Sequence, residues 1–400
     1  MSDIYESLGI ATMVNAYGPV TRFGGGVMPA EVVEAMAAAT QHSIDIPQLQ
    51  ARASHIIAGI SGAEAGCVTA GASAAVLAGT AACVTGFDAG KMNRLPDTRG
   101  MRNEVIVIRS QRNGYDHAVR AVGVKLVEVG LCDRIADTGV RDAEAWEIRD
   151  AITADTAAIF YLAKPHSRPR LPEVTQIARE AGIPVLVDAA AELPPLSNLK
   201  QFIGEGADLV AFSGGKAING PQGSGFLCGR RDLVGAALLQ QIDLDYLPEE
   251  WEPPALIDRR NLAGVPRHGI ARSCKLGKEQ IVGALSALQL FAREGDEGRR
   301  ARLQAQGEVL LSALAGLPGL SARIAHDPEE GGMPMVELAL DPRIAKLDAA
   351  SLLSQLRSGR PRIELRPFRP QEGLLIAALG CLRPGDPALI AKRLAEILRP

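Results

Sequence analysis

Two apolar segments of this chain each end in a side chain that can carry out acid–base or nucleophilic chemistry. Residues 185–188 are Val-Leu-Val-Asp, and residues 212–216 are Phe-Ser-Gly-Gly-Lys. A primary amine such as that of Lys216 forms a Schiff base with an aldehyde, and a carboxylate such as that of Asp188 pairs with a protonated ring nitrogen. Because pyridoxal 5'-phosphate (PLP) presents both groups, the two segments predict PLP as the cofactor.

Both residues are predicted to stand where strands end. Three apolar residues precede Asp188 and three alanines follow it, and ligands of open α/β sheets bind at such carboxyl ends. Lys216 must be unprotonated to act as a nucleophile, and burial or a nearby cation lowers the pKa of a lysine amine. The competing interpretations are a capping or turn aspartate and a lysine in an exposed turn. Glu192 follows closely and either reaches the site or faces solvent.

The candidate phosphate site is a turn between a predicted strand and a helix of small residues. It consists of Gly71, Ala72 and Ser73. Backbone N–H groups and the dipole at the amino end of a helix attract anions, and the Ser73 hydroxyl either binds phosphate as well or caps the helix. Ser213 is a second candidate ligand. An ordinary strand-to-helix turn has a similar sequence.

An aromatic ring is expected to cover the flat ring of the cofactor. Tyr115 and His117 follow a predicted strand, and we favour His117 for this position and as a possible acid. The alternatives are an ordinary turn histidine and a packed tyrosine.

Cationic side chains outside the predicted sheet are candidates for binding an anionic substrate. Guanidinium groups bind carboxylate or phosphate through two parallel hydrogen bonds. We select Arg22, Arg272 and Lys275, against the alternative that each is a solvated surface charge. The six cysteines and six histidines are scattered without metal-ligand spacing, so no metal is expected.

The elements that must position these residues alternate along the chain, which is typical of a mostly parallel sheet covered by helices on both faces. The last predicted strand follows Lys216 closely and is expected to be antiparallel. We predict an α/β fold with an N-terminal segment (1–45), a large cofactor-binding domain (46–255) and a smaller α+β C-terminal domain (256–400). The predicted strands are 65–69, 104–108, 125–129, 157–161, 185–187, 209–212 and 225–228, and the main helices 29–39, 45–60, 74–84, 171–181 and 278–293.

Composition limits the class of protein. The chain has 400 residues, 47% of them hydrophobic and 22% charged, with a formal net charge of -3. This balance provides no basic surface for nucleic acid or an anionic membrane. No apolar run approaches the roughly 20 residues that span a bilayer, and the start lacks the pattern of a signal peptide. We therefore expect a cytoplasmic protein without nucleic-acid or membrane partners.

With these residues placed, the chain resembles the fold-type I (aspartate aminotransferase-like) PLP-dependent enzymes of the selenocysteine synthase-like group. Within that group it is most similar to the ammonia-lyases of D-glucosaminate 6-phosphate. The resemblance implies a homodimer or higher homo-oligomer in which a neighbouring subunit completes each site. It is carried by residues 14–16, 20–25, 68–75, 115–118, 187–195, 212–216, 220–222, 272–278 and 384–385.

The resemblance implies α,β-elimination from a β-hydroxy amino acid or a phosphorylated amino sugar acid, which yields a 2-keto-3-deoxy acid and ammonia. In this scheme Lys216 removes the α-proton, Asp188 keeps the cofactor ring protonated, and Lys216 or His117 assists loss of the hydroxyl. The same residues support racemisation, aldol cleavage or a β-replacement like that of selenocysteine synthase. A PLP-binding protein without turnover is the alternative from a different class.

Overall fold

The computed structural model describes residues 4–132, 140–247 and 249–399, which form two compact units. The larger unit is Met28–Ala292, and the smaller joins Met1–Val27 to Arg293–Pro400. The sequence predicted divisions after residues 45 and 255. The structure places residues 256–292 in the larger unit, because Ile257, Ala271 and Ile281 are buried in its two hydrophobic cores.

A seven-stranded sheet forms the centre of the larger unit, with strand order β2-β10-β9-β8-β7-β3-β4 among the described residues. β10 runs antiparallel to both its neighbours and the other pairs are parallel, as predicted. The strands are β2 (Ala65–Thr69), β3 (Glu104–Ile108), β4 (Lys125–Val129), β7 (Thr156–Leu162), β8 (Val185–Asp188), β9 (Leu209–Ser213) and β10 (Gly225–Gly229).

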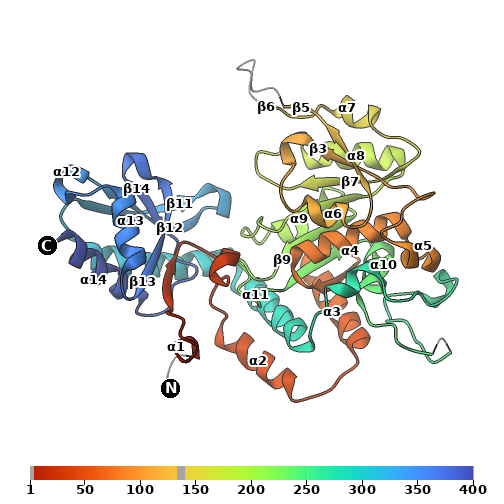
Figure 1. Cartoon of the computed structure of the whole chain (residues 1–400), viewed down its shortest axis with the longest axis horizontal. Helices are drawn as coiled ribbons and strands as arrows, with labels where there is room; N and C mark the ends of the chain where they lie inside the picture. The colour runs from red at the N-terminus through yellow and green to blue at the C-terminus, as the bar shows by residue number, and fades with distance from the viewer. Residues whose placement is uncertain (1–3, 133–139, 248, 400) are drawn as a thin grey trace. The chain divides into compact units, whose positions relative to one another are not determined.

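Helices cover both faces of this sheet, because side chains alternate along each strand and both sets are apolar. Val187 and Val210 pack in one core, and Leu186 and Leu209 pack in the other. The first core includes residues of α2 (Ala30–Thr40), α3 (Ile46–Ser61), α8 (Leu171–Ala181), α9 (Asn198–Gly204) and the start of α11 (Lys278–Leu314) (Figure 1). The second includes α4 (Gly71–Thr85), α5 (Ala89–Arg94), α6 (Asp116–Arg120) and α10 (Arg231–Gln241).

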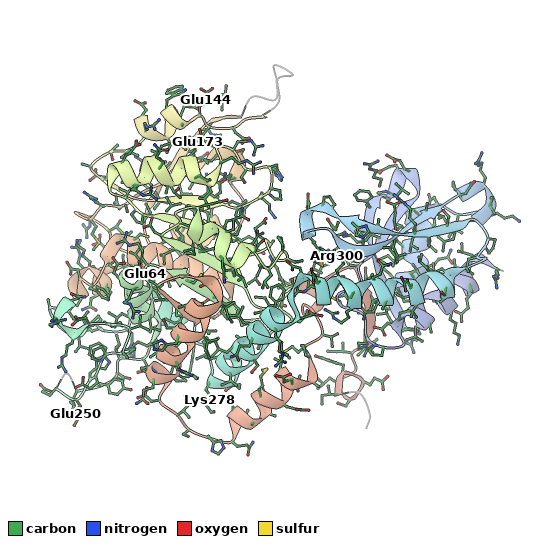
Figure 2. All side chains as sticks on the ribbon, turned by 180° about the vertical axis from the view of Figure 1, so that it is seen from behind. Glu64, Glu144, Glu173, Glu250, Lys278 and Arg300 are labelled. Atoms are coloured by element: carbon green, nitrogen blue, oxygen red, sulfur yellow. The ribbon has the colours of Figure 1, made fainter. Side chains whose placement is uncertain are left out.

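Two acidic residues labelled in Figure 2 are examples of exposed charges on the larger unit. Glu173 on α8 and Glu64 before β2 are exposed (Figure 2). Two shorter elements complete the described part of the unit, the helix α7 (Ala145–Asp150) and the ribbon of β5 (Leu131–Cys132) with β6 (Val140–Arg141).

The smaller unit is built on a five-stranded sheet with order β1-β13-β14-β12-β11. β1 (Met13–Ala16) pairs in parallel with β13 (Arg362–Arg369), which explains why the first residues belong with the last hundred. The remaining strands are β11 (Leu320–Asp327), β12 (Met333–Leu340) and β14 (Leu374–Ala377), and the helices are α1 (Ile4–Ser7), α12 (Pro342–Ala345), α13 (Ala349–Ser358) and α14 (Asp386–Leu398).

Helix α11 begins at Lys278 in the larger unit (Figure 2) and is interrupted at Gly295, whose φ of 66° suits glycine. It is longer than the predicted helix 278–293. None of the helices in the described ranges has the length and apolar character needed to cross a membrane.

Candidate active site

The carboxyl ends of the parallel strands meet at one edge of the larger sheet, and the candidate site is built there. β9 ends at Ser213, and the chain then turns back on itself: the Gly214 N–H donates to Ser224 O (2.9 Å), and the Gly220 N–H donates to Gly214 O (2.9 Å). A Cβ atom at Gly215 would lie 2.6 Å from Gln222 Cα, so only glycine fits. This turn holds Lys216 at the edge of the sheet, where it is partly buried.

Asp188 ends β8, the parallel neighbour of β9, so its carboxylate and the Lys216 amine share this edge. Asp188 is only 6% exposed, and its Oδ1 accepts the Ala190 N–H at 3.0 Å. Burial raises the pKa of Asp188, although that hydrogen bond and the positive charge of Lys216 act in the opposite direction. Burial lowers the pKa of Lys216 even though Asp188 attracts its charged form. Burial therefore favours a neutral, nucleophilic amine beside a carboxylate that a further cation would stabilise.

The predicted phosphate turn lies across β10 from Ser213. Gly225 pairs with Thr69 on one side and with Ser213 on the other. A Cβ at Gly225 would lie 2.6 Å from the Ala72 nitrogen, so glycine allows β10 to approach the first turn of α4. The first N–H groups of a helix have no acceptor within it and attract anions. The structure thus brings Ser213 and the segment 71–73 to one edge, with the Ser73 side chain exposed.

His117 lies in α6, which follows β3 at the same edge, but its ring is exposed. Arg120 Nη2 lies 3.0 Å from His117 Nδ1. The neighbouring Asp116 is buried, at 2% exposed, and it forms an ion pair with Arg112. Asp116 also acts electrostatically on Asp188. The sequence analysis selected His117 in this segment and did not single out the buried carboxylate of Asp116.

Arg272 and Lys275 both line a cavity of about 300 Å³ in the same unit. Arg272 Nη2 binds Asp243 Oδ2 at 2.6 Å, and this hydrogen bond lowers the pKa of Asp243. The Arg272 Nε is buried and, within the described part of the chain, has no hydrogen-bond partner. The cavity lining excludes Lys216 and Asp188. The two cations therefore line the same cavity within this unit.

Arg22 belongs to the smaller unit and is described there by itself. Its guanidinium lies 4.7 Å from the ring centre of Tyr17 and 4.6 Å from that of Phe23. Arg22 lines a cavity of about 510 Å³ together with Arg383 and Asp386. The cavity therefore combines the guanidinium groups of Arg22 and Arg383 with the aromatic ring of Phe23.

Three polar residues at this edge of the sheet, Lys164, Glu192 and Gln111, were missed or left open by the sequence analysis. Lys164, which follows β7, binds Glu192 with Nζ 2.8 Å from Oε1. Gln111, which follows β3, accepts the Leu162 N–H with its Oε1 at 2.9 Å, and its buried Nε2 has no partner among the described residues. The signal that selected Asp188, a polar residue just after an apolar strand, also applies to Lys164.

Comparison with known proteins identifies the family. Residues 13–245 match the L-seryl-tRNA selenium transferase family, which is more than half of the chain. The chain belongs to this family. The predicted resemblance to the selenocysteine synthase-like group is thereby confirmed.

Two relatives of this selenium transferase-like chain match nearly its full length. It is 33% identical to the 5'-C-glycyluridine monooxygenase-decarboxylase of a Streptomyces species, over 98% of this chain and 92% of the relative. It is 29% identical to the D-glucosaminate-6-phosphate ammonia lyase of Salmonella typhimurium, over 99% of this chain and 98% of that enzyme.

Solved structures confirm the predicted fold of this family member. The structure of D-glucosaminate-6-phosphate ammonia-lyase matches with a TM-score of 0.83 at 29% identity, over 100% of this chain and 99% of that one. A mutant of C-DES with glycine covalently linked to its PLP cofactor matches with a TM-score of 0.51 at 20% identity, over 99% of this chain and 100% of that one, which supports the fold alone. The fold is that of the fold-type I PLP-dependent enzymes.

Proposed function

We propose that this chain is a PLP-dependent lyase that eliminates water from a β-hydroxy amino acid or a phosphorylated amino sugar acid. The products are a 2-keto-3-deoxy acid and ammonia. The single observation that carries the proposal is that Asp188 ends β8 and Lys216 follows the end of its parallel neighbour β9, at one edge of the sheet where burial shifts their pKa values in opposite directions. Similarity to D-glucosaminate-6-phosphate ammonia lyase over 99% of the chain supports the reaction and the substrate class.

The residues at this edge fit PLP, which is the cofactor. The Asp188 carboxylate is 6% exposed and is suited to a protonated ring nitrogen. The Lys216 amine, with its lowered pKa, is suited to the cofactor aldehyde. Gly71, Ala72, Ser73 and Ser213 would hold the phosphate group, and His117 would cover the ring. When bound, PLP supplies an electron sink for negative charge at the α-carbon of a substrate amine.

The chain's own residues then handle the protons. Lys216 Nζ takes the proton from the substrate α-carbon, which its neutral form permits. The Asp188 carboxylate would stabilise the protonated ring nitrogen of the bound cofactor. The β-hydroxyl leaves as water after receiving a proton from Lys216 Nζ or from the His117 ring. The resulting enamine hydrolyses to the keto acid and ammonia, so atoms and charge balance without an external oxidant.

Substrate anions are assigned to the three predicted cations. Arg272 and Lys275 share one cavity, and Arg22 lines another, so each cavity offers a guanidinium to a carboxylate or phosphate. Arg272→Ala and Arg22→Ala are expected to raise KM more than they lower kcat, because binding of a non-reacting anion is retained through the transition state. A loss confined to kcat would contradict this assignment.

The test of the reaction is a panel of D- and L-β-hydroxy amino acids and amino sugar acids that includes D-glucosaminate 6-phosphate. Each is scored for ammonia, 2-keto acid, aldehyde and inversion, with the Lys216→Ala variant as control. Ammonia with keto acid in equal amounts supports the lyase. Aldehyde with glycine indicates an aldolase, inversion alone a racemase, and the absence of any product from the whole panel contradicts the proposal.

A second candidate is oxygen-dependent decarboxylation, and it rests on the 33% identity to 5'-C-glycyluridine monooxygenase-decarboxylase over 98% of this chain. The carbanion chemistry is shared, but molecular oxygen is then the oxidant and carbon dioxide is released. An oxygen electrode and a carbon dioxide assay with 5'-C-glycyluridine separate the two. Oxygen uptake with this compound and no ammonia from the sugar acids would favour the second candidate.

A homo-oligomer in the cytoplasm remains a prediction, supported by the family resemblance and by the composition. Light scattering coupled to size-exclusion chromatography measures the subunit number, and cell fractionation measures the location. A monomer that is fully active at nanomolar concentration would contradict shared active sites.

A further inference from the structure

Two further charges lie beside the Lys216–Asp188 pair. Lys164 follows β7 and Glu192 follows β8, and these two strands are parallel neighbours. Lys164 Nζ lies 2.8 Å from Glu192 Oε1, with the lysine side chain 34% exposed and the glutamate side chain 6% exposed. An ion pair that is buried to this extent at a ligand-binding edge differs from an ordinary surface pair.

The backbone holds both side chains in place. The Ala163 N–H donates to Asp188 O at 2.9 Å, which ties the loop of Lys164 to the strand of Asp188. On the other side, Asn198 Nδ2 donates to Glu192 O at 2.6 Å. The charges are therefore fixed relative to the end of β8.

Both charges act on Lys216. The pKa of its amine is lowered first by burial and then by the ammonium of Lys164, and it is raised by the carboxylates of Asp188 and Glu192. Lys164 also lowers the pKa of Asp188, whereas Asp116 on α6, which is bound to Arg112, raises it. The charges that act on the Lys216 amine within the described residues thus come from Asp188 at the end of β8, from Lys164 after β7 and from Glu192 after β8, whereas Asp116 on α6 acts on Asp188.

We propose that Lys164 and Glu192 are positioning residues of this site, which together set the balance of charge beside the Lys216 amine: Lys164 favours the neutral, nucleophilic form of the amine, and Glu192 opposes that effect. Lys164 repels a proton from that amine. Glu192 holds the Lys164 ammonium in place and limits the repulsion. The inference rests on the part of the proposed function in which PLP attaches to Lys216, and it is independent of which reaction follows.

The test is a pH titration of Lys216 in the full-length chain. With PLP bound, the absorbance of the lysine–cofactor adduct is followed against pH. Without PLP, the rate at which acetic anhydride labels Lys216 is followed by peptide mass spectrometry. Lys164→Met should move the midpoint upward by about one pH unit, because a nearby positive charge is lost. Glu192→Gln should move it downward, because a negative charge is lost.

Opposite shifts from the two halves of one ion pair would not arise from a purely structural role, which would disturb both variants alike. Lys164→Arg keeps the charge and should keep the midpoint of the parent protein. Lys200→Met is the matched control, since Lys200 is an exposed lysine whose Cγ lies near Gly62, before β2. If Lys164→Met does not fold, Lys164→Gln, which keeps a polar group, takes its place.

Midpoints that stay fixed, or that move in the same direction in both variants, overturn the inference. Failure of the proposed function is distinguishable, because the labelling experiment needs no cofactor. A parent chain that forms no adduct with PLP contradicts the cofactor role, whereas the shifts in labelling still decide the role of Lys164 and Glu192.

Discussion

The two sheets of this protein place carboxylates in opposite surroundings. At the edge of the seven-stranded sheet, Asp188 is 6% exposed and burial raises its pKa, although Lys216 lies beside it. In the smaller unit, Asp341 caps α12, and its hydrogen bond with Arg343, whose Nη2 lies 2.9 Å from Oδ2, lowers its pKa. The folded chain thus stabilises the ionised form at Asp341 and disfavours it at Asp188. A carboxylate whose ionised form is disfavoured by burial at the edge of a sheet is typical of a functional site. An exposed ion pair is typical of an ordinary protein surface.

The largest loss of turnover should come from replacing Lys216, because its amine acts both as the nucleophile and as the proton acceptor. Lys216→Ala is expected to lower kcat by about 10³-fold or more, as expected for a proton-transfer group that also binds the cofactor. Steady-state ammonia release measures it. Turnover within tenfold of the parent enzyme would remove Lys216 from the mechanism.

Asp188 comes next, and its effect should fall on turnover rather than on cofactor affinity. Asp188→Ala removes the group that keeps the ring protonated, so kcat should fall by about 10²-fold or more, within the range for electrostatic stabilisation. The Kd for PLP, measured by fluorescence quenching, should change much less. Equal losses of kcat and of affinity for PLP would argue against this role.

The close approach of β10 to α4 gives a third comparison. Gly225→Ala places a Cβ 2.6 Å from the Ala72 nitrogen and should destabilise the fold by about 1–3 kcal/mol while weakening PLP binding. Gly223→Ala is the control, because the nearest atom, Gln280 Nε2, is 3.8 Å away. Urea unfolding measures the loss of stability, and PLP titration measures the loss of cofactor affinity. If Gly225→Ala and Gly223→Ala have the same stability and the same affinity for PLP, the first turn of α4 tolerates displacement by the added Cβ.

A smaller, pH-dependent effect should appear in the chain without cofactor. Asp188→Asn is expected to raise Tm by a few degrees at pH 7, because burial raises the pKa of Asp188 and so disfavours the ionised carboxylate in the folded chain. The cost is absent below the unfolded pKa of about 3.9, grows as the pH rises from there to the raised folded pKa, and stays constant above it. The gain should therefore shrink as the pH falls toward 4. A variant that is less stable than the parent protein at pH 7 would refute the account of burial.

The smallest effect on activity and stability should come from disrupting the exposed ion pair of Arg343 and Asp341. Arg343→Ala is expected to leave kcat and PLP binding unchanged and to move Tm little, because an exposed ion pair contributes little to stability. Differential scanning calorimetry and the ammonia assay measure these quantities. A large loss of activity in Arg343→Ala would contradict the view that Asp188 belongs to a functional site and Asp341 to an ordinary surface.

Sequence patterns predicted the larger sheet well, because buried parallel strands are short apolar runs with clear boundaries. Val185–Asp188 and Leu209–Ser213 matched their predicted strands closely. The division into units was harder to predict, since β1 pairs with β13 across most of the chain length and no local pattern encodes that contact. The first residues could be assigned to their unit only from the structure.

Distance from a strand end decides which candidate site residues a sequence pattern can indicate. Asp188, Lys216 and the turn at Gly71 stand next to strands, where local sequence predicts position. The pairing of Lys164 with Glu192 depends on the order of β7 and β8 within the sheet, which spacing along the chain does not reveal. The exposure of His117 beside the buried Asp116 depends on how the short helix α6 is rotated against its neighbours.

Reductive trapping of the cofactor tests the central claim most directly. The full-length chain is incubated with PLP, treated with borohydride and digested, and the modified peptide is identified by mass spectrometry. We predict one stoichiometric pyridoxyl adduct on Lys216. An adduct on Lys164 or Lys275 instead, or a chain that stays unmodified at saturating PLP, would contradict it.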